Sequence, residues 1–408
     1  MRVNVLMISP GFPAEMPFFT EGLASVGANV IGIGDQPLGA LPDRAQKALS
    51  AYVRVGSLWD EGPVIDEVRK IATQTEIHVV ECLWEPGMIL AAKIREMLRL
   101  PGMTVQETLP FRDKETMKQV LDQHGIRTPR HARATTADGV RHAAEEIVGY
   151  PLVVKPIAGA GAKDTYRINN REELENIFPA LGHVPEVSVE EFIEGDDMTF
   201  DTVCINGEIA FSNVFLYRPR ALQIQTIEWI SPQTIALRNL EHESISDGVR
   251  MGKAVLKALG FRTGFTHMEW YRKPDGEAVF GEIGARPPGG RTVDLMNYTC
   301  DIDLFRGWAE AVCHGRFSQP IDRKWNAAII FKRAIGEGAI SRIEGLDHLM
   351  SEFGSHVAAV QLSPIGAAKK SFRRSLTSDG YLVVRHPDFQ TCLQMADRVG
   401  TDLTLYAE

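Results

Sequence analysis

Residues 265–290 read FTHMEWYRKPDGEAVFGEIGARPPGG. Apolar and polar side chains alternate on both sides of a Pro-Asp-Gly tripeptide, and this pattern predicts a β-hairpin. With the turn centred on residues 274–275, Glu269 would lie opposite Phe280 and diagonal to Glu282. Diagonal neighbours on one face of a hairpin are about 7–8 Å apart at Cα. The hairpin therefore predicts two carboxylates on the same surface.

Two carboxylates at that spacing can hold a cation between them. Without a cation they repel each other, and burial adds a cost to each charge. A ligand set made only of oxygens favours Mg²⁺ or Mn²⁺, and substrate phosphates usually complete the shell of such an ion. The alternative is a solvated sheet face that carries two unrelated acids. The sequence therefore makes Glu269 and Glu282 candidate metal ligands.

Length and composition limit the class of protein. The chain has 408 residues, which is enough for two or three domains. A formal net charge of −9 argues against a protein that coats nucleic acid or an anionic membrane. No stretch reaches the roughly 18 apolar residues of a membrane span. The five cysteines are scattered and lack the spacing of a metal site, so we expect a cytoplasmic protein with reduced thiols.

The N-terminal part of the chain alternates strands and helices. Apolar, β-rich runs at residues 3–8, 30–33 and 77–80 are separated by helical patterns, which predicts a parallel, doubly wound sheet. Ligands of such sheets bind at the carboxyl ends of the strands. The loops at residues 9–17 and 83–87 are therefore candidate substrate walls, unless they are ordinary Pro/Gly connections.

The middle and the end of the chain mix helices and strands. Asn206-Gly207 predicts a type I′ hairpin turn. Residues 217–232 lack a clear periodicity, and we expect a long loop there, near the site. A further α+β segment begins at Trp325. The expected fold class is thus α/β combined with α+β.

Two more segments have the composition of a nucleotide site. Lys155 ends the apolar run VVKP, and a lysine there is costly to bury unless it meets an anion. The small-residue loop that follows frees backbone N–H groups for phosphate oxygens, but the lysine precedes the glycines, so this is not a Walker A motif. Lys114 opens a predicted helix and by itself could be a solvated charge. Residues 189–197 form a strand that runs into an acidic turn, where main-chain groups could read adenine and a carboxylate could accept ribose hydroxyls.

Taken in order, these features resemble the ATP-grasp superfamily. The resemblance rests on Lys114, on VVKP with its small-residue loop, on the EEFI run at 190–193 with Asp197, and on the hairpin with the following RPPGG. It implies an ATP-grasp architecture with a nucleotide clamped between two subdomains. The expected units are an N-terminal Rossmann-like (pre-ATP-grasp) domain at 1–109, an ATP-grasp domain at 110–320 with a small lid subdomain at about 130–200, and a C-terminal lobe at 321–408.

The resemblance implies a role for each matching residue. Lys114 and Lys155 would contact the nucleotide phosphates. Glu269 and Glu282 would ligate Mg²⁺ or Mn²⁺, and Arg286 would face the γ-phosphate and the acyl phosphate formed from it. The loop expected to fold over the phosphates comprises Gly159, Ala160, Gly161, Ala162 and Lys163, and the residues expected to hold adenosine are Glu190, Glu191, Phe192, Ile193 and Asp197.

One position departs from the family pattern. The family usually carries Asn two residues after the second metal-binding Glu, whereas this chain has Gly284. The amino-acid ligase and other carboxylate–amine ligase branches tolerate a small residue there, but the geometry of a second metal is put in doubt.

Two more side chains are candidates for catalysis. His267, placed opposite Glu282 in the expected hairpin, could position substrate or shuttle a proton, or be a packed histidine; Arg291 could clamp a substrate carboxylate, or lie on the surface.

The reaction implied by the resemblance is that of an ATP-dependent carboxylate–amine ligase. ATP would phosphorylate a carboxylate, an amine would attack the acyl phosphate, and an amide, ADP and phosphate would leave. The expected partners are small carboxylates and amines such as amino acids, with no nucleic acid and no membrane; a homodimer is left open. The alternatives are a biotin-carboxylase-like or formyl-phosphate-type enzyme on the same fold and a catalytically silent ATP-binding regulatory protein. A dinucleotide-dependent oxidoreductase is disfavoured, because no GxGxxG motif follows the first strand.

Overall fold

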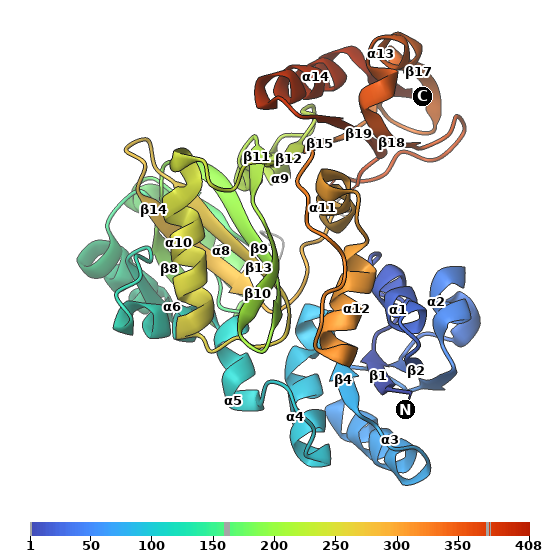
Figure 1. The fold of residues 1–408 in the computed structure, drawn as a ribbon. Helices are drawn as coiled ribbons and strands as arrows, with labels where there is room; N and C mark the ends of the chain where they lie inside the picture. The colour runs from blue at the N-terminus through green and yellow to red at the C-terminus, as the bar shows by residue number, and fades with distance from the viewer. Residues whose placement is uncertain (1, 159–163, 373–374, 376) are drawn as a thin grey trace.

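The computed structural model describes residues 2–158, 164–372, 375 and 377–408. Within these ranges the strands form four sheets, joined by helices along the whole chain (Figure 1). None of the helices in the described part of the chain has the length and apolar character that a membrane crossing requires. The mixture of parallel and antiparallel sheets confirms the expected α/β and α+β class.

The first sheet has the strand order β3-β2-β1-β4, and its paired strands are all parallel. In β1, Leu6 and Ile8 pack into one apolar cluster, whereas Val5 and Met7 pack into another. The strand is therefore buried on both faces, as its continuous apolar run requires. The elements of this part are β1 (Asn4–Ile8), α1 (Met16–Ser25), β2 (Asn29–Gly34), η1 (Leu38–Ala40), α2 (Asp43–Ala48), β3 (Ala51–Arg54), α3 (Glu61–Gln74), β4 (Val79–Glu81), η2 (Glu85–Gly87) and α4 (Met88–Leu98).

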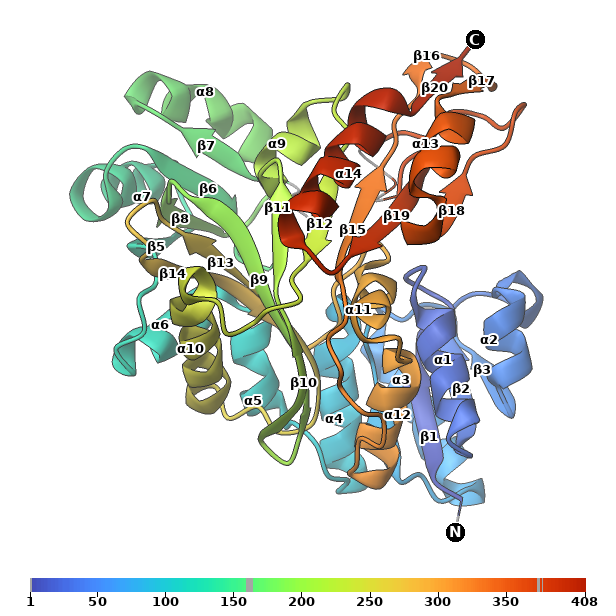
Figure 2. The same cartoon turned by 45° about the horizontal axis from the view of Figure 1, so that its top comes forward.

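The second sheet is antiparallel and has the order β5-β8-β6-β7. In Figure 2 it lies on the opposite side of β9 and β13 from the parallel sheet. It falls within the segment expected to form the lid. Its elements, and those that lead to it, are α5 (Val105–Thr108), η3 (Leu109–Phe111), α6 (Lys114–Gln123), β5 (His131–Ala134), α7 (Ala137–His142), η4 (Ala143–Val148), β6 (Leu152–Pro156), β7 (Tyr166–Ile168), α8 (Arg171–Leu181) and β8 (Val187–Glu191).

The third sheet has nine strands in the order β14-β13-β9-β11-β12-β15-β19-β18, with β10 paired to β9. Residues 217–232 contain the end of β11 and helix α9, so the expectation of a long loop there was wrong. The elements are β9 (Asp196–Ile205), β10 (Glu208–Asn213), β11 (Phe215–Arg218), α9 (Ala221–Thr226), β12 (Gln233–Ala236), α10 (Glu243–Ala258), β13 (Gly264–Arg272), β14 (Ala278–Gly284), α11 (Thr292–Cys300), α12 (Leu304–His314), β15 (Asn326–Phe331), β18 (Val357–Leu362) and β19 (Gly380–His386).

The C-terminal segment contributes strands to this large sheet and also forms a small sheet of its own, in the order β16-β20-β17. Its further elements are β16 (Ile335–Gly336), β17 (Ile340–Glu344), α13 (Leu346–Phe353), η5 (Gly354–His356), α14 (Phe389–Asp402) and β20 (Thr404–Ala407). The turn between β9 and β10 has positive φ at both central residues, 54° at Asn206 and 93° at Gly207. The predicted type I′ turn is thereby confirmed.

The hairpin of β13 and β14 differs from the expected register. Glu269 pairs directly with Glu282, not with Phe280, and His267 pairs with Gly284. The register shifts between Glu269 and Trp270, as happens where a bulge adds one residue to a strand. At Gly281 a Cβ atom would lie 2.8 Å from the carbonyl oxygen of Glu269, so glycine permits this close approach. The two carboxylates are direct neighbours, with Cβ atoms about 4.5–5.5 Å apart.

Candidate active site

One pocket is lined by residues of the second sheet, the nine-stranded sheet and the start of α6. Segments far apart in the sequence therefore meet there, and they include most of the candidates that sequence reasoning named. The predicted residues that line the pocket are Lys114, Lys155, Glu190, Glu191, Phe192, Ile193, Asp197, Glu269 and Glu282. The candidates Gly159, Ala160, Gly161, Ala162 and Lys163 lie outside the described residues.

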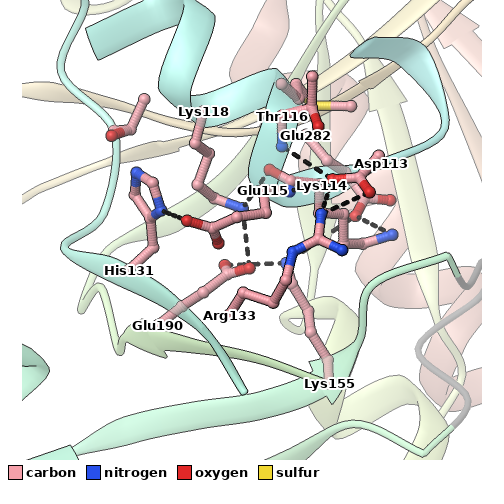
Figure 3. Close-up of polar contacts among 12 residues, drawn as sticks. Asp113, Lys114, Glu115, Thr116, Lys118, His131, Arg133, Lys155, Glu190 and Glu282 are labelled. Carbon is pink, nitrogen blue, oxygen red and sulfur yellow. Dashed lines mark hydrogen bonds and ion pairs between the residues drawn. The ribbon is translucent and has the colours of Figure 1, made fainter. Parts of the chain in front are cut away.

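Three lysines and two glutamates form a charge cluster at this pocket (Figure 3), and all of them except Lys118 line it. Glu190 lies between two ammonium groups, with Lys118 Nζ at 2.8 Å and Lys155 Nζ at 3.0 Å. Glu282 Oε2 lies 3.1 Å from Lys114 Nζ and 3.9 Å from Lys155 Nζ. Counted by formal charge, the five groups carry a net charge of about +1 at neutral pH. Lys114 and Lys155 are the two lysines of this cluster that line the pocket, where they could pair with an anion such as a nucleotide phosphate.

Helix α6 presents two of these lysines because of how it begins. Asp113 is its N-cap, and its carboxylate accepts hydrogen bonds from the backbone N–H groups of Glu115 and Thr116 at 3.1 and 2.8 Å. This cap fixes Lys114 in the first turn. Lys118 lies one turn later on the same face and is completely buried. The sequence alone favours a surface position for Lys118, because a lysine is rarely found fully buried.

The protonation states follow from burial and from the paired charges. Burial alone would raise the pKa of Glu282, but Lys114 and Lys155 outweigh it and hold that pKa at about 2. Burial would also raise the pKa of Glu190, but Lys118 and Lys155 hold it well below its usual range. Burial alone would lower the pKa of Lys155, yet the two glutamates raise it above its usual range. At neutral pH both carboxylates are ionised and Lys155 is protonated.

Glu269 and Glu282 fit a shared divalent cation. Both carboxylates line the pocket, and their direct pairing across the hairpin puts both side chains on one face. Mg²⁺ is commonly held by only one or two carboxylates together with substrate phosphates, so the pair suffices.

His267 lies beside Glu269. Asp201 Oδ1 lies 2.6 Å from Nδ1 of His267, whose Nε2 lies 3.4 Å from Glu269 Oε1. Burial would lower the pKa of His267, but Asp201 and Glu269 raise it to about 9. The ring of His267 is therefore protonated at neutral pH, and in this form it orients the carboxylate of Glu269.

Burial would lower the pKa of Arg286, but the charge of Glu85 outweighs burial and raises this pKa above its usual range. The charges of Glu282 and Glu269 add to the rise, because Arg286 lies near these two metal-ligand candidates. Glu85 belongs to the N-terminal part of the chain, and its Oε2 accepts from Arg286 Nε at 2.6 Å. Its other oxygen pairs with Arg112. The loop at residues 83–87, expected to be a substrate wall, thus touches the residue expected to face the γ-phosphate.

Of the residues expected to hold adenosine, Glu190 belongs to the charge cluster, and Phe192, Ile193 and Asp197 line the pocket close to Arg220. Arg220 was missed by sequence reasoning, although it lies in the segment expected near the site. Its Nε donates to Asp197 Oδ1 and its Nη2 donates to the carbonyl oxygen of Ile193, both at 2.8 Å. Its guanidinium also lies 4.9 Å from the ring centroid of Phe192. Tyr217 also lines the pocket, and burial, reinforced by the charge of Glu269, raises its pKa well above the usual range, so its hydroxyl remains a donor.

Two candidates have other partners. Arg291 does not line this pocket; its Nε lies 2.9 Å from Asp294 Oδ2 and its guanidinium lies 4.2 Å from the ring centroid of Phe18. Glu191 lines the pocket, but its carboxylate accepts from Arg127 at 3.2 Å. Their expected roles remain predictions.

Comparison with known proteins finds related sequences and structures. The family model of the ATP-grasp domain matches residues 119–296. An L-arginine-specific L-amino acid ligase of Bacillus subtilis is 24% identical over 275 residues, which are 63% of this chain and 65% of that protein. An alanine–anticapsin ligase of Bacillus subtilis is 25% identical over 275 residues, 63% of this chain and 58% of that protein. The match thus spans less than two thirds of the length of these curated relatives.

Solved structures show the same fold along the whole chain. The crystal structure of an L-amino acid ligase from Bacillus licheniformis matches with a TM-score of 0.79 at 23% identity, over 100% of this chain and 99% of that one. N5-carboxyaminoimidazole ribonucleotide synthetase from Thermotoga maritima matches with a TM-score of 0.71 at 18% identity, over 100% of both chains. Residues 119–296 therefore match the ATP-grasp domain in sequence, and the fold of the chain is similar to that of these ligases.

Proposed function

We propose that the protein is an ATP-dependent carboxylate–amine ligase that forms an amide bond and releases ADP and phosphate. The observation that carries the proposal is the convergence of Lys114, Lys155, Glu269 and Glu282 on one pocket, close to Arg286. Cations for a triphosphate and carboxylates for a divalent ion are thus assembled around one point. Phosphoryl transfer depends mainly on such positioning and electrostatic stabilisation.

Each residue then has a physical task. Lys114 and Lys155 neutralise phosphate oxygens, and the raised pKa of Lys155 keeps it charged in this role. Arg286 offsets the charge that develops on the transferred phosphoryl group, as a donor placed where charge accumulates does. Glu269 and Glu282 would hold Mg²⁺ or Mn²⁺, which would offset negative charge on the substrate phosphates.

The substrates are proposed to be amino acids. Both named Bacillus subtilis relatives are ligases, one L-arginine-specific and the other joining alanine to anticapsin. Phosphorylation turns the hydroxyl of a substrate carboxylate into a good leaving group, and an α-amino group is a suitable nucleophile. Enclosure of the acyl phosphate would keep water away from it. A carboxylase that uses bicarbonate is the main rival, because enzymes that share this fold include N5-carboxyaminoimidazole ribonucleotide synthetases.

Chromatography of the spent nucleotide tests the proposal. The protein is incubated with ATP, Mg²⁺ and a panel of L-amino acids, singly and in pairs, with Lys155→Ala as the inactive control. We expect ADP and phosphate in equal amounts with the amide product. AMP and pyrophosphate as products would refute the proposal, and ADP release that needs bicarbonate and no amino acid would favour the carboxylase.

A further inference from the structure

A second cavity lies at the edge of the parallel sheet where β1 and β2 end. It is lined by the residues that follow these strands and by Trp84, which follows β4, and it encloses about 300 Å³. This is the edge at which open α/β sheets bind their ligands. The volume is at the lower end of the range for small-molecule sites, so it has room for an amino-acid side chain.

Aromatic rings form the walls of this cavity. Phe12, Tyr52, Trp59 and Trp84 all line it, and Trp59 and Trp84 meet edge to face with their ring centroids 5.1 Å apart. Phe12 is 53% exposed and Trp59 is 71% exposed, so much of their apolar surface contacts no protein. Rings left open to solvent around a cavity are typical of a ligand site.

The position of Tyr52 is fixed by the strand beneath it. Its hydroxyl donates to the carbonyl oxygen of Gln36 at 2.6 Å. A Cβ atom at Gly34 would lie 2.7 Å from that hydroxyl oxygen, so glycine makes room for the ring at the end of β2. The aromatic wall is therefore held in place without a ligand.

A carboxylate completes the cavity. Of the described residues that line it, Asp35 is the one with a charged side chain. Its Oδ2 accepts a hydrogen bond from the backbone N–H of Leu58 at 3.5 Å, which orients the group. Arg54 donates to the main-chain carbonyl of Asp35 at 3.3 Å and does not line the cavity. Aromatic faces attract cations, and a carboxylate among them adds a second attraction for positive charge.

The cavity adjoins the reaction centre along the chain. Trp84 has extended backbone geometry, with φ −82° and ψ 110°, and the next residue, Glu85, begins the short helix η2. The ring of Trp84 lines the cavity, whereas the carboxylate of Glu85 bonds to Arg286 at 2.6 Å. The cavity therefore lies one residue along the chain from the carboxylate that bonds to Arg286, the group proposed to face the acyl phosphate.

We propose that this cavity is the side-chain subsite for an amino-acid substrate that carries a cationic ammonium or guanidinium group. The proposal rests on the amino-acid ligase function stated above and specifies its substrate class. The cation lies against the aromatic rings that line the cavity and pairs with Asp35. A neutral side chain of the same length fills the same space but leaves the carboxylate without a partner.

Pairs of amino acids that differ only in charge test this subsite. ADP release is measured with L-lysine against L-norleucine and with L-arginine against L-citrulline, each with L-alanine as co-substrate. We expect kcat/KM to be at least tenfold higher for the cationic member of each pair. Asp35→Asn keeps the acceptor for Leu58 and should bring the ratio close to one. Asp60→Asn, which removes an exposed carboxylate outside the cavity, should leave the ratio unchanged.

Calorimetric titration without ATP separates the two proposals. Tighter binding of lysine and arginine than of their neutral partners, lost in Asp35→Asn, supports the subsite even if no pair releases ADP, and only the ligase function then fails. ADP release with equal or better use of norleucine and citrulline overturns the subsite and leaves the ligase function standing. An unchanged ratio in Asp35→Asn, with the melting temperature preserved, also overturns it.

Discussion

Replacing Glu190 by Gln tests the electrostatic account of the pocket wall. Glu190 is 4% exposed, and its two oxygens face Lys118, which is fully buried, and Lys155. The substitution keeps the shape of the side chain and removes its charge. Two ammonium groups then lie about 3 Å from a neutral amide, and one of them, Lys118, has no contact with solvent. We expect a large loss of stability that depends on pH.

The size of the loss can be bounded in two ways. Removing one partner of a buried ion pair costs about 3–5 kcal/mol. Lys118 can instead lose its proton, and from a usual pKa of 10.5 this costs at most about 1.36 × 3.5, or about 5 kcal/mol, at pH 7. At pH 9 the same limit is about 1.36 × 1.5, or about 2 kcal/mol. The penalty should therefore shrink by up to about 3 kcal/mol between the two values of pH.

The sign of this pH dependence follows from linkage. Burial lowers the pKa of Lys118 in the folded protein, and Lys155 adds to this shift while Glu190 opposes it. The folded state therefore binds fewer protons than the unfolded state as the pH approaches 10.5 from below, and stability rises with pH in that window. Without Glu190 the window extends to lower pH, so the variant regains stability between pH 7 and pH 9.

Urea denaturation at pH 7 and pH 9 measures both effects. The set comprises Glu190→Gln, Lys118→Met and the double variant, with Glu186→Gln as a control that breaks only a half-exposed pair with Arg133 and should cost less than about 1 kcal/mol. The double variant should be more stable at pH 7 than Glu190→Gln, because the unpaired ammonium is gone. Equal penalties at the two values of pH, or additive losses in the double variant, would refute the reasoning.

Three further outcomes follow from the site. Arg286→Ala should lower kcat by on the order of 10²–10³ with little change in the Kd for ATP, whereas Lys155→Ala should weaken ATP binding as well. Calorimetry with ATP and steady-state kinetics distinguish the two variants. Lost ATP binding in Arg286→Ala would contradict the role of Arg286. Gly284→Asn should lower kcat without changing the Mg²⁺ concentration that gives half-maximal rate, because a Cβ there would lie 3.2 Å from Cγ of Arg286; a tighter Mg²⁺ response would show instead that an added ligand is the main effect. Glu282→Gln should abolish turnover at every metal concentration, whereas Glu269→Gln should recover in high Mg²⁺ or Mn²⁺, and equal recovery of both would show that Glu282 has no special position.

Much of the site was predictable because its residues stand at places where the sequence is unambiguous. The Pro-Asp-Gly turn and the alternation around it predicted the hairpin, and the lysine at the end of VVKP predicted an anion partner because burying an unpaired charge is costly. That lysine, Lys155, does meet two buried or half-buried carboxylates in the structure. Local pattern and the cost of burial were sufficient to predict the hairpin and an anionic partner for Lys155, but not the register that pairs Glu269 with Glu282.

Other features depend on contacts that a single sequence does not display. Gly281 in the middle of β14 was a signal for a bulge, but only the folded hairpin shows that it shifts the register by one residue. Lys118 reads as surface charge on a helix, and its burial depends on Glu190, 72 residues away. Glu85 lies 201 residues before Arg286. In each case the partner is set by the tertiary fold and not by spacing.

The charge cluster divides into a fixed part and an exchangeable part. The side chain of Glu190 is 5% exposed and bridges Lys118 and Lys155, so its charge is compensated within the protein and largely shielded from solvent. The side chain of Glu282 is 27% exposed and pairs with Lys114 at 3.1 Å, so it can exchange this cation for another. A phosphate that reaches Lys114 and a divalent ion that reaches Glu282 would each take over one half of this pair, and no buried charge would be left alone. Changes at Glu190 should therefore act on folding, and changes at Glu282 should act on turnover.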